Sequence, residues 1–171
     1  MSRLTAILIT IISLAICGAS CITDGEPDNA SGLIAGSNLP SFSLTMNDGK
    51  SLSSAELTGR TGVIIFFNTE CSDCQRELPE MQNVYALTKD DAVWLAIARE
   101  EGEEAISEFW TQHNLSIPYS PQTDRHIYEL FASNGIPRLY LTDGSVITYS
   151  FDPESIPTAD DLYQLILSIK H

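Results

Sequence analysis

Positively charged residues are scarce in this chain. Its 171 residues include 9 lysines and arginines against 23 aspartates and glutamates, which gives a formal net charge of −14 at pH 7. Binding to nucleic-acid phosphates needs clustered lysine and arginine side chains, and the sequence contains no such cluster. The composition therefore excludes a nucleic-acid partner and predicts a well-solvated acidic surface.

Histidine and cysteine are also few. The three histidines are His113, His126 and His171, and none stands at ligand spacing from a cysteine. A metal site needs more ligands than two thiols, so we expect no metal ion. A copper-binding module remains an alternative for a chain with paired cysteines.

Internal repeats and low-complexity tracts are absent, which excludes a repeat architecture. The hydrophobic content of 43% is sufficient for one core. The length and composition together predict one folded domain with a leader or tail.

The first twenty residues have the composition of a leader. One cation, Arg3, precedes an uninterrupted run of apolar and small residues from Ala6 to Ala19. This pattern predicts a secretory signal peptide over residues 1–20. The following Gly18-Ala19-Ser20-Cys21 resembles the bacterial lipobox, which implies cleavage before Cys21 and its lipidation. The alternative is a plain signal peptide cut near Ser20 or Cys21, without an anchor.

Removal of the leader would leave Cys71 and Cys74 as the only cysteines of the folded part, because Cys17 would be lost with it. A pair this close in sequence provides no structural disulfide framework. The expected location is extracytoplasmic, on the periplasm-facing side of a bacterial membrane, where disulfides are permitted. The polar composition of residues 21–38 predicts a flexible tether, with the domain over 39–171.

The stretch around the two remaining cysteines has a pattern suited to redox chemistry. The apolar run Val63–Phe67 has the length of a buried strand and stops at a short polar turn. Cys71 and Cys74 follow at C-x-x-C spacing, at the start of a predicted helix. Two thiols on one helical turn can close a small disulfide ring, and the helix N-terminus favours the first thiolate. The pattern predicts thiol–disulfide exchange.

The rest of the chain alternates predicted strands and helices. This order predicts an α/β fold with a central mixed sheet, helices on both faces and an N-terminal β-hairpin. The helix with the cysteines should begin at the C-terminal end of a central strand. The predicted elements are a hairpin over 40–53 with its turn at Asp48-Gly49, a short helix ending at Leu57, a strand over 63–67, a helix from Cys71 kinked at Pro79, a strand over 92–98, helices over 103–113 and 124–132, a hairpin over 137–149 and a helix from Thr158.

Taken together, these features resemble a thioredoxin-fold protein, and more narrowly a TlpA-like, AhpC/TSA-related thiol–disulfide oxidoreductase. The resemblance runs from about residue 36 to the C-terminus and implies a thioredoxin-like three-layer domain. The motifs that carry it are Pro40-x-Phe42-x-Leu44, the turn at Asp48-Gly49, Cys71-x-x-Cys74-x-x-Glu77-x-Pro79, and Gly135-Ile136-Pro137 followed by Leu139-Tyr140-Leu141-Thr142-Asp143-Gly144.

The resemblance implies roles for individual residues. Cys71 matches the attacking thiol and Cys74 the resolving thiol, which implies a redox-active Cys71–Cys74 disulfide. Pro137 matches the family's cis-proline, and Ile136 before it would face the disulfide and help to hold the client. Glu77 matches the acidic residue that modulates proton transfer to the resolving thiol. An ordinary trans proline and a solvated surface glutamate are the alternatives at these positions.

The chain also departs from the family pattern. Glu70 stands where members usually have tryptophan, and Ile65 where thioredoxins have a buried aspartate. Glu70 and Asp73 place negative charge beside Cys71, which opposes thiolate formation, whereas the helix start promotes it. We therefore expect the cysteine pair to be reducing and not strongly oxidising.

The implied partners are protein disulfide or dithiol clients and a membrane or periplasmic electron donor, with no organic cofactor. A peroxiredoxin-like peroxidase would have Thr or Ser three residues before its reactive cysteine, but Asn68 precedes Cys71 and Cys71 precedes Cys74 at that distance. The remaining alternative is a non-catalytic interaction lipoprotein whose cysteines only form a disulfide.

Overall fold

The structure is a computed structural model that describes residues 32–169. The predicted signal peptide, Cys21 and most of the predicted tether lie outside the described residues. Within the described part of the chain, no helix has both the length and the apolar character needed to cross a membrane.

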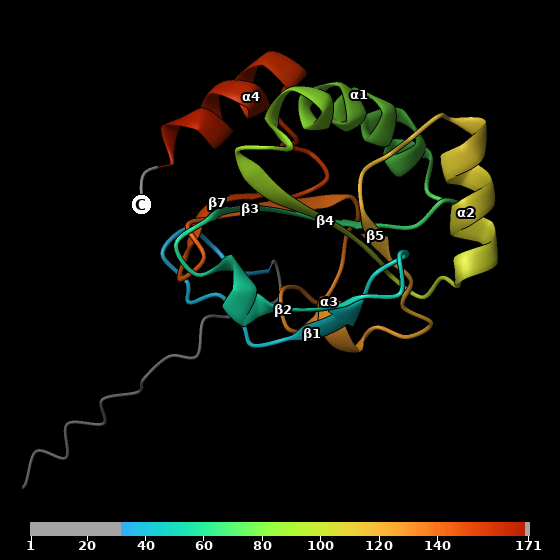
Figure 1. Cartoon of the computed structure of the whole chain (residues 1–171), viewed down its shortest axis with the longest axis horizontal. Coiled ribbons are helices and arrows are strands. Elements are labelled where there is room, and N and C mark those ends of the chain that lie inside the picture. The colour runs from blue at the N-terminus through green and yellow to red at the C-terminus, as the bar shows by residue number, and fades with distance from the viewer. Residues whose placement is uncertain (1–31, 170–171) are drawn as a thin grey trace, which may run out of the picture.

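A five-stranded mixed sheet forms the centre of the domain, in the order β5-β4-β3-β6-β7 (Figure 1). β4 runs parallel to both β3 and β5, whereas β6 is antiparallel to β3 and to β7. The strands are β3 (Thr61–Phe67), β4 (Ala92–Ala98), β5 (Tyr119–Ser120), β6 (Arg138–Thr142) and β7 (Ile147–Phe151).

The two faces of the sheet are covered by different elements. Helices α1 (Ser72–Thr88) and α4 (Ala159–Ser168) lie over one face, with α2 (Glu103–Gln112) at its side (Figure 1). The other face carries the hairpin of β1 (Ser43–Thr45) and β2 (Ser51–Ser53), the short 3-10 helix η1 (Ser54–Leu57) and α3 (His126–Glu129). The predicted mixed sheet, helices on both faces and N-terminal hairpin are confirmed.

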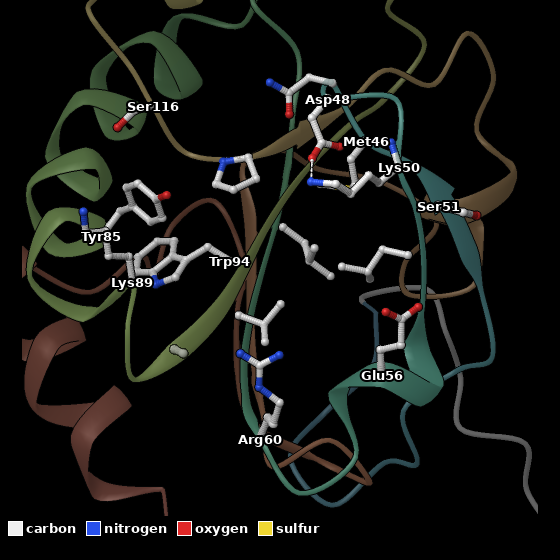
Figure 2. Close-up of a pocket in the computed structure, with 16 residues that line it drawn as sticks. Met46, Asp48, Lys50, Ser51, Glu56, Arg60, Tyr85, Lys89, Trp94 and Ser116 are labelled. Carbon is white, nitrogen blue, oxygen red and sulfur yellow. Dashed lines mark hydrogen bonds and ion pairs between the residues drawn. The ribbon is translucent and has the colours of Figure 1, made fainter.

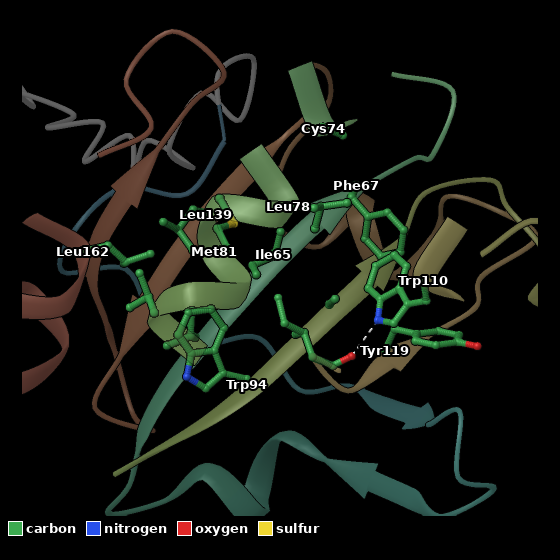
Figure 3. Close-up of a cluster of buried hydrophobic side chains, with 14 of the residues drawn as sticks. Ile65, Phe67, Cys74, Leu78, Met81, Trp94, Trp110, Tyr119, Leu139 and Leu162 are labelled. Carbon is green, nitrogen blue, oxygen red and sulfur yellow. Dashed lines mark hydrogen bonds between the residues drawn. The ribbon is translucent and has the colours of Figure 1, made fainter. Parts of the chain in front are cut away.

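Burial on both faces explains the continuous apolar run of β3. Successive side chains of a strand point to opposite faces. Accordingly, Val63, Ile65 and Phe67 pack among residues of α1, α2 and α4, and Ile64 and Phe66 pack with the hairpin and α3. All seven residues of β3 are buried. Figure 3 shows the first of these two clusters.

Two elements differ from the sequence prediction. The helix predicted over 124–132 is limited to His126–Glu129. At its start the Asp124 side chain accepts from the His126 amide. After it the Leu130 and Phe131 amides donate three residues back, to Ile127 O and Tyr128 O, which is the spacing of a 3-10 turn and not of an α-helix. The edge strand β5 was not predicted. It has two residues between Pro118 and Pro121, and flanking prolines obscure a strand signal.

The end of the predicted tether contacts the domain. Leu33 is buried and donates its amide to Phe131 O at 2.7 Å, and the Gly36 amide donates to Ile147 O at 2.8 Å. Asn38 forms an isolated bridge with Val146. Packing of the chain against the domain therefore extends to Leu33, six residues before the predicted boundary at 39.

Candidate active site

Cys71 and Cys74 lie just beyond the C-terminal end of the central strand β3. Cys71 is the N-cap of α1 and is half-buried, whereas Cys74, in the first turn, is fully buried. Both are free thiols. Cys74 belongs to the apolar cluster that packs beneath α1, together with Leu78 and Met81 (Figure 3). One thiol is accessible from solvent and the other is shielded behind it.

A set of hydrogen bonds fixes the loop before Cys71. The Asn68 carbonyl accepts from the Cys71 amide at 3.1 Å, and the Asn68 side-chain amide donates to Arg99 O at 3.2 Å. The Thr69 carbonyl accepts from the side chain of Gln75 at 2.8 Å. These contacts tie the loop both to α1 and to the end of β4.

Glu101 is a buried carboxylate that the sequence analysis missed. It accepts from the Thr69 amide at 2.8 Å and from the Thr69 hydroxyl. Its sequence neighbours Glu100, Glu103 and Glu104 are exposed. The acidic run therefore has the composition of a solvated surface, and nothing in it indicates that the Glu101 carboxylate is buried. Ile65, which stands where thioredoxins have a buried aspartate, is fully buried. Among the described residues, the buried carboxylate close to the cysteines is Glu101, which anchors the loop before them.

Burial raises the pKa of the Cys74 thiol well above its ordinary value. The neighbouring Cys71 thiol contributes in the same direction, while a hydrogen bond to the Asn68 backbone and the charge of Arg99 act against it. Cys74 is therefore held as the neutral thiol, and its ionisation needs a proton acceptor.

The Ile136–Pro137 peptide bond is cis, as expected from the sequence. The Ile136 carbonyl accepts from the Cys71 thiol, with a sulfur–oxygen distance of 3.6 Å. The structure thus brings Cys71, Cys74, Ile136 and Pro137 together at one end of the sheet.

Four consecutive carbonyls of residues 133–136, which we call the 133–136 loop, each accept from a side chain. Three of the donors are outside the cysteine motif and were not predicted. The pairs are Arg125 Nη2 to Ser133 O at 2.7 Å, Arg138 Nε to Asn134 O at 2.8 Å, Tyr128 OH to Gly135 O at 2.8 Å and Cys71 Sγ to Ile136 O.

Tyr128 is itself fixed between two cations. The guanidinium carbons of Arg99 and Arg125 each lie 5.3 Å from the centre of its ring, within the range of cation–π attraction. The Tyr128 side chain therefore links the end of β4 to the 133–136 loop.

Arg76 forms ion pairs with two of the carboxylates near the cysteines. Its guanidinium contacts Asp73 at 2.8 Å and Glu77 at 2.9 Å. Glu77 is half-buried and lies one helical turn after Cys74, on the same face of α1. Glu70 is exposed and has no ionic partner among the described residues.

The histidines are apart from this site. His113 is exposed and stacks on Phe109, with ring centres 4.1 Å apart, His126 is exposed at the start of α3, and His171 lies outside the described residues. Over residues 32–169, no three His, Cys, Asp or Glu side chains converge in an arrangement that could hold a metal ion.

Comparison with known proteins identifies related chains. A family model described as the AhpC/TSA family matches residues 35–150. The thiol-disulfide oxidoreductase ResA of Bacillus cereus (strain ZK / E33L) is 28% identical over 136 residues, covering 78% of this chain and 79% of that protein.

Solved structures resemble the whole domain. A thiol:disulfide interchange protein of the thioredoxin family from Chlorobium tepidum TLS superposes with a TM-score of 0.65 at 22% identity, covering 77% of this chain and 94% of the other. A secreted Mycobacterium tuberculosis disulfide oxidoreductase homologous to E. coli DsbE gives 0.66 at 21% identity, with coverages of 75% and 96%. These likenesses show the thioredoxin fold.

Proposed function

Because this chain belongs to the AhpC/TSA family and is a thiol–disulfide oxidoreductase with the thioredoxin fold, we propose that Cys71 and Cys74 are the sulfurs that exchange disulfides with protein clients. The supporting observation is the unequal exposure of two thiols on one helical turn. Cys71 is accessible at the helix start, and Cys74 is buried behind it.

The cycle begins when the Cys71 thiolate attacks one sulfur of a client disulfide. A Cys71–client disulfide forms, and the other client sulfur leaves as a thiolate. Cys74 then loses its proton and attacks the Cys71 sulfur, which forms the Cys71–Cys74 disulfide and releases the second client thiolate. The client gains two electrons, and a separate dithiol donor must return two electrons to the cysteine pair.

Other residues of the site support these steps. The free amides at the start of α1 and the helix dipole stabilise negative charge on the Cys71 sulfur. The Ile136 and Pro137 backbone lies against Cys71, where it can hold an extended client segment. Glu77, one turn from Cys74, is the proposed acceptor of the Cys74 proton.

Reduction of insulin by dithiothreitol tests the redox pair. We expect the unmodified protein to accelerate the reaction, and Cys71→Ser and Cys74→Ser to remove the acceleration. Only the Cys74→Ser variant should accumulate a mixed disulfide with a client, because its attacking thiol is intact while the resolving thiol is missing. Full activity of either variant would contradict the assignment.

We also propose that the pair is reducing. The exposed Glu70 carboxylate beside Cys71 repels negative charge on that sulfur, so the reduced form of the pair is stabilised less than in a strongly oxidising protein. In glutathione buffers, the pair should stay mostly disulfide-bonded at ratios of reduced to oxidised glutathione that fully reduce a strongly oxidising thioredoxin-fold protein. Glu70→Gln should shift the equilibrium toward the dithiol, and an unchanged equilibrium would contradict the role of this charge.

The location proposed is extracytoplasmic, with residues 1–20 as a lipoprotein signal, Cys21 as the lipidated residue and a short tether before the domain. The support is the sequence pattern of Arg3, the apolar run and the small residues before Cys21. Expressed in a bacterium, the full chain should fractionate with membranes. Cys21→Ser should release it from them, and retention of this variant on the membrane would contradict a lipid anchor.

A further inference from the structure

A groove of about 510 Å³ lies at the opposite end of the sheet from the cysteines. Its floor is the first half of β4, from Ala92 to Leu95. The register of the parallel strands pairs Ala92 with Thr61 and Ala98 with Phe67, so the floor of the groove lies about 10 to 20 Å from the redox end. The groove is therefore separate from the proposed redox site.

Two layers of the domain provide the walls of this groove. Figure 2 shows Tyr85 of α1 and Lys89, the residue after this helix, on one side, and Asp48, Lys50 and Ser51 of the hairpin on the other. Trp94 is fixed on the α1 side by a hydrogen bond from its indole to Thr88 at 3.1 Å and by an edge-on contact with the Tyr85 ring.

The edge of β4 is open along the groove. β5 pairs only with Ala96 and Ile97, and the Ala96 amide donates to Pro118 O at 3.0 Å. Because strand backbone groups alternate in direction, Trp94 and Ala92 point their N–H and C=O groups toward the same edge. In the part of the chain that the structure describes, no backbone segment pairs with these groups on that side.

The chain that precedes β5 turns away from this edge. The Ser116 and Ile117 amides donate to the side chain of Gln82 on α1, at 2.7 and 3.2 Å. These contacts remove the residues that would otherwise extend β5 alongside Trp94, so the edge of β4 is left open by the structure itself.

The lining of the groove has a small net positive charge, three cations against two carboxylates, on a strongly acidic protein. Three of the seven lysines and arginines among the described residues line it: Lys50, Arg60 and Lys89. Lys50 pairs with Asp48 at 2.6 Å. Arg60 and Lys89 are exposed, and neither has an ionic partner over residues 32–169. Glu56, the other acid in the lining, caps the Ser53 amide.

We propose that this groove binds an acidic segment of a partner protein in extended conformation, as an added strand on the open edge of β4. Main-chain hydrogen bonds to Ala92 and Trp94 would provide affinity, and alternate side chains of the segment would face the two walls. Lys89 on one wall and Arg60 at the end of the groove select acidic over basic sequences.

Binding of a fluorescein-labelled octapeptide, Glu-Glu-Val-Val repeated twice, to the full chain tests the proposal by fluorescence anisotropy. We expect saturable binding that weakens as salt is added, and binding at least about tenfold weaker when lysine replaces glutamate in the peptide. Equal affinity for the acidic and basic peptides, or no binding of the acidic one, would overturn the proposal.

Backbone pairing has its own test in the same assay. Peptides N-methylated at all odd or at all even positions differ only in which edge of the strand has lost its N–H groups. One set should lose binding and the other should keep it. Equal binding of both sets would contradict strand addition.

Charge-reversal variants place the binding site. The double variant Arg60→Glu, Lys89→Glu should bind the acidic peptide about tenfold more weakly. Lys89→Glu alone should weaken binding severalfold, whereas Arg76→Glu, the same single charge reversal at the other end of α1, should alter binding by less than about twofold. Thermal unfolding checks that each variant is folded. An equal loss of affinity with Arg76→Glu would mean that the effect comes from the net charge of the protein, and would overturn the assignment of the site to the groove.

A second copy of this chain is the competing occupant. Sedimentation of the protein alone should show a monomer, and it should remain one when the peptide is added. A dimer that the acidic peptide dissociates would mean that another copy occupies the groove, and would overturn the assignment of a separate acidic partner.

Discussion

Cys71 and Cys74 are separated by two residues, yet their surroundings differ in the property that matters for exchange. Cys71 contacts the Ile136 carbonyl at the surface, whereas Cys74 is fully buried, and burial raises the pKa of its thiol. In the proposed cycle, Cys71 therefore meets the client, and Cys74 acts only after a nearby base removes its proton.

Replacing Glu77 tests this proton transfer. Glu77→Gln should prolong the lifetime of the Cys71 mixed disulfide about tenfold, because the carboxylate one turn from Cys74 is lost. Quenched-flow measurement of the mixed disulfide gives this lifetime. Glu80→Gln, an exposed glutamate on the same helix, is the matched control and should leave it unchanged. Equal lifetimes in the two variants would exclude Glu77 from the step.

Tyr128 offers a second test at the residue scale. Tyr128→Phe removes the hydrogen bond to Gly135 O and should lower the free energy of unfolding by about 1 kcal/mol. Because the 133–136 loop loses one of its supports, we expect a higher KM for insulin and an unchanged rate with a small aromatic disulfide.

The control for this change is Tyr163→Phe on α4, since no hydrogen bond of the Tyr163 hydroxyl occurs within the described residues. Its insulin KM should match that of the unmodified protein. If Tyr128→Phe slowed insulin and the small disulfide equally, the effect would be on the cysteines and not on the client loop.

At the scale of elements, the two hairpins use the same turn residues in different surroundings. Each turn has an Asp-Gly pair, and both glycines have positive φ, +79° at Gly49 and +90° at Gly144. A Cβ on Gly49 would meet open space, whereas a Cβ on Gly144 would overlap the Leu57 carbonyl. The second turn is therefore packed against η1.

Alanine substitutions separate backbone strain from this steric overlap. Gly49→Ala should lower the free energy of unfolding by about 1 kcal/mol, the cost of a positive φ. Gly144→Ala should lower it by more than about 3 kcal/mol, because η1 must also move. Urea unfolding measures both values. Similar losses of unfolding free energy for the two variants would mean that η1 can move away from the turn at little cost.

At the scale of the whole molecule, the buried Cys74 thiol links the proposed redox site to the free energy of unfolding. In the unfolded chain the Cys74 thiol has its ordinary pKa of 9.0. The native state keeps the Cys74 proton at higher pH values, at which the unfolded chain has lost it. The unfolded state then binds fewer protons than the native state. The contribution of Cys74 to the free energy of unfolding is therefore complete below about pH 9. It falls as the pH rises further, by up to about 1.4 kcal/mol per pH unit.

Urea unfolding of the reduced protein between about pH 8 and pH 10 measures this slope. Cys74→Ala should show a shallower decline than the unmodified protein, and Cys71→Ala should retain the decline. Tyr119, whose pKa is raised to about 12 by burial and by Glu103, adds to the loss in all three proteins and cancels in the comparison. Parallel slopes in all three would contradict a neutral, buried Cys74.

The sequence by itself determined the order of the main elements and the place of the two cysteines at the start of a helix. Local patterns carry that information: the apolar run of β3, the helical spacing after Cys71 and the Asp-Gly turns are each defined within a few residues. The cis bond before Pro137 was also expected, from its flanking motif.

Only the tertiary structure decided the features that depend on distant partners. Glu101 was hidden in an acidic run, and Arg125, Tyr128 and Arg138 gave no local sign that they hold the 133–136 loop. The open edge of β4 likewise results from the shortness of β5, and the prolines on both sides of β5 hide this strand from sequence-based prediction. Long-range hydrogen bonds and strand pairing are set by the packing of the whole chain, so no local pattern encodes them.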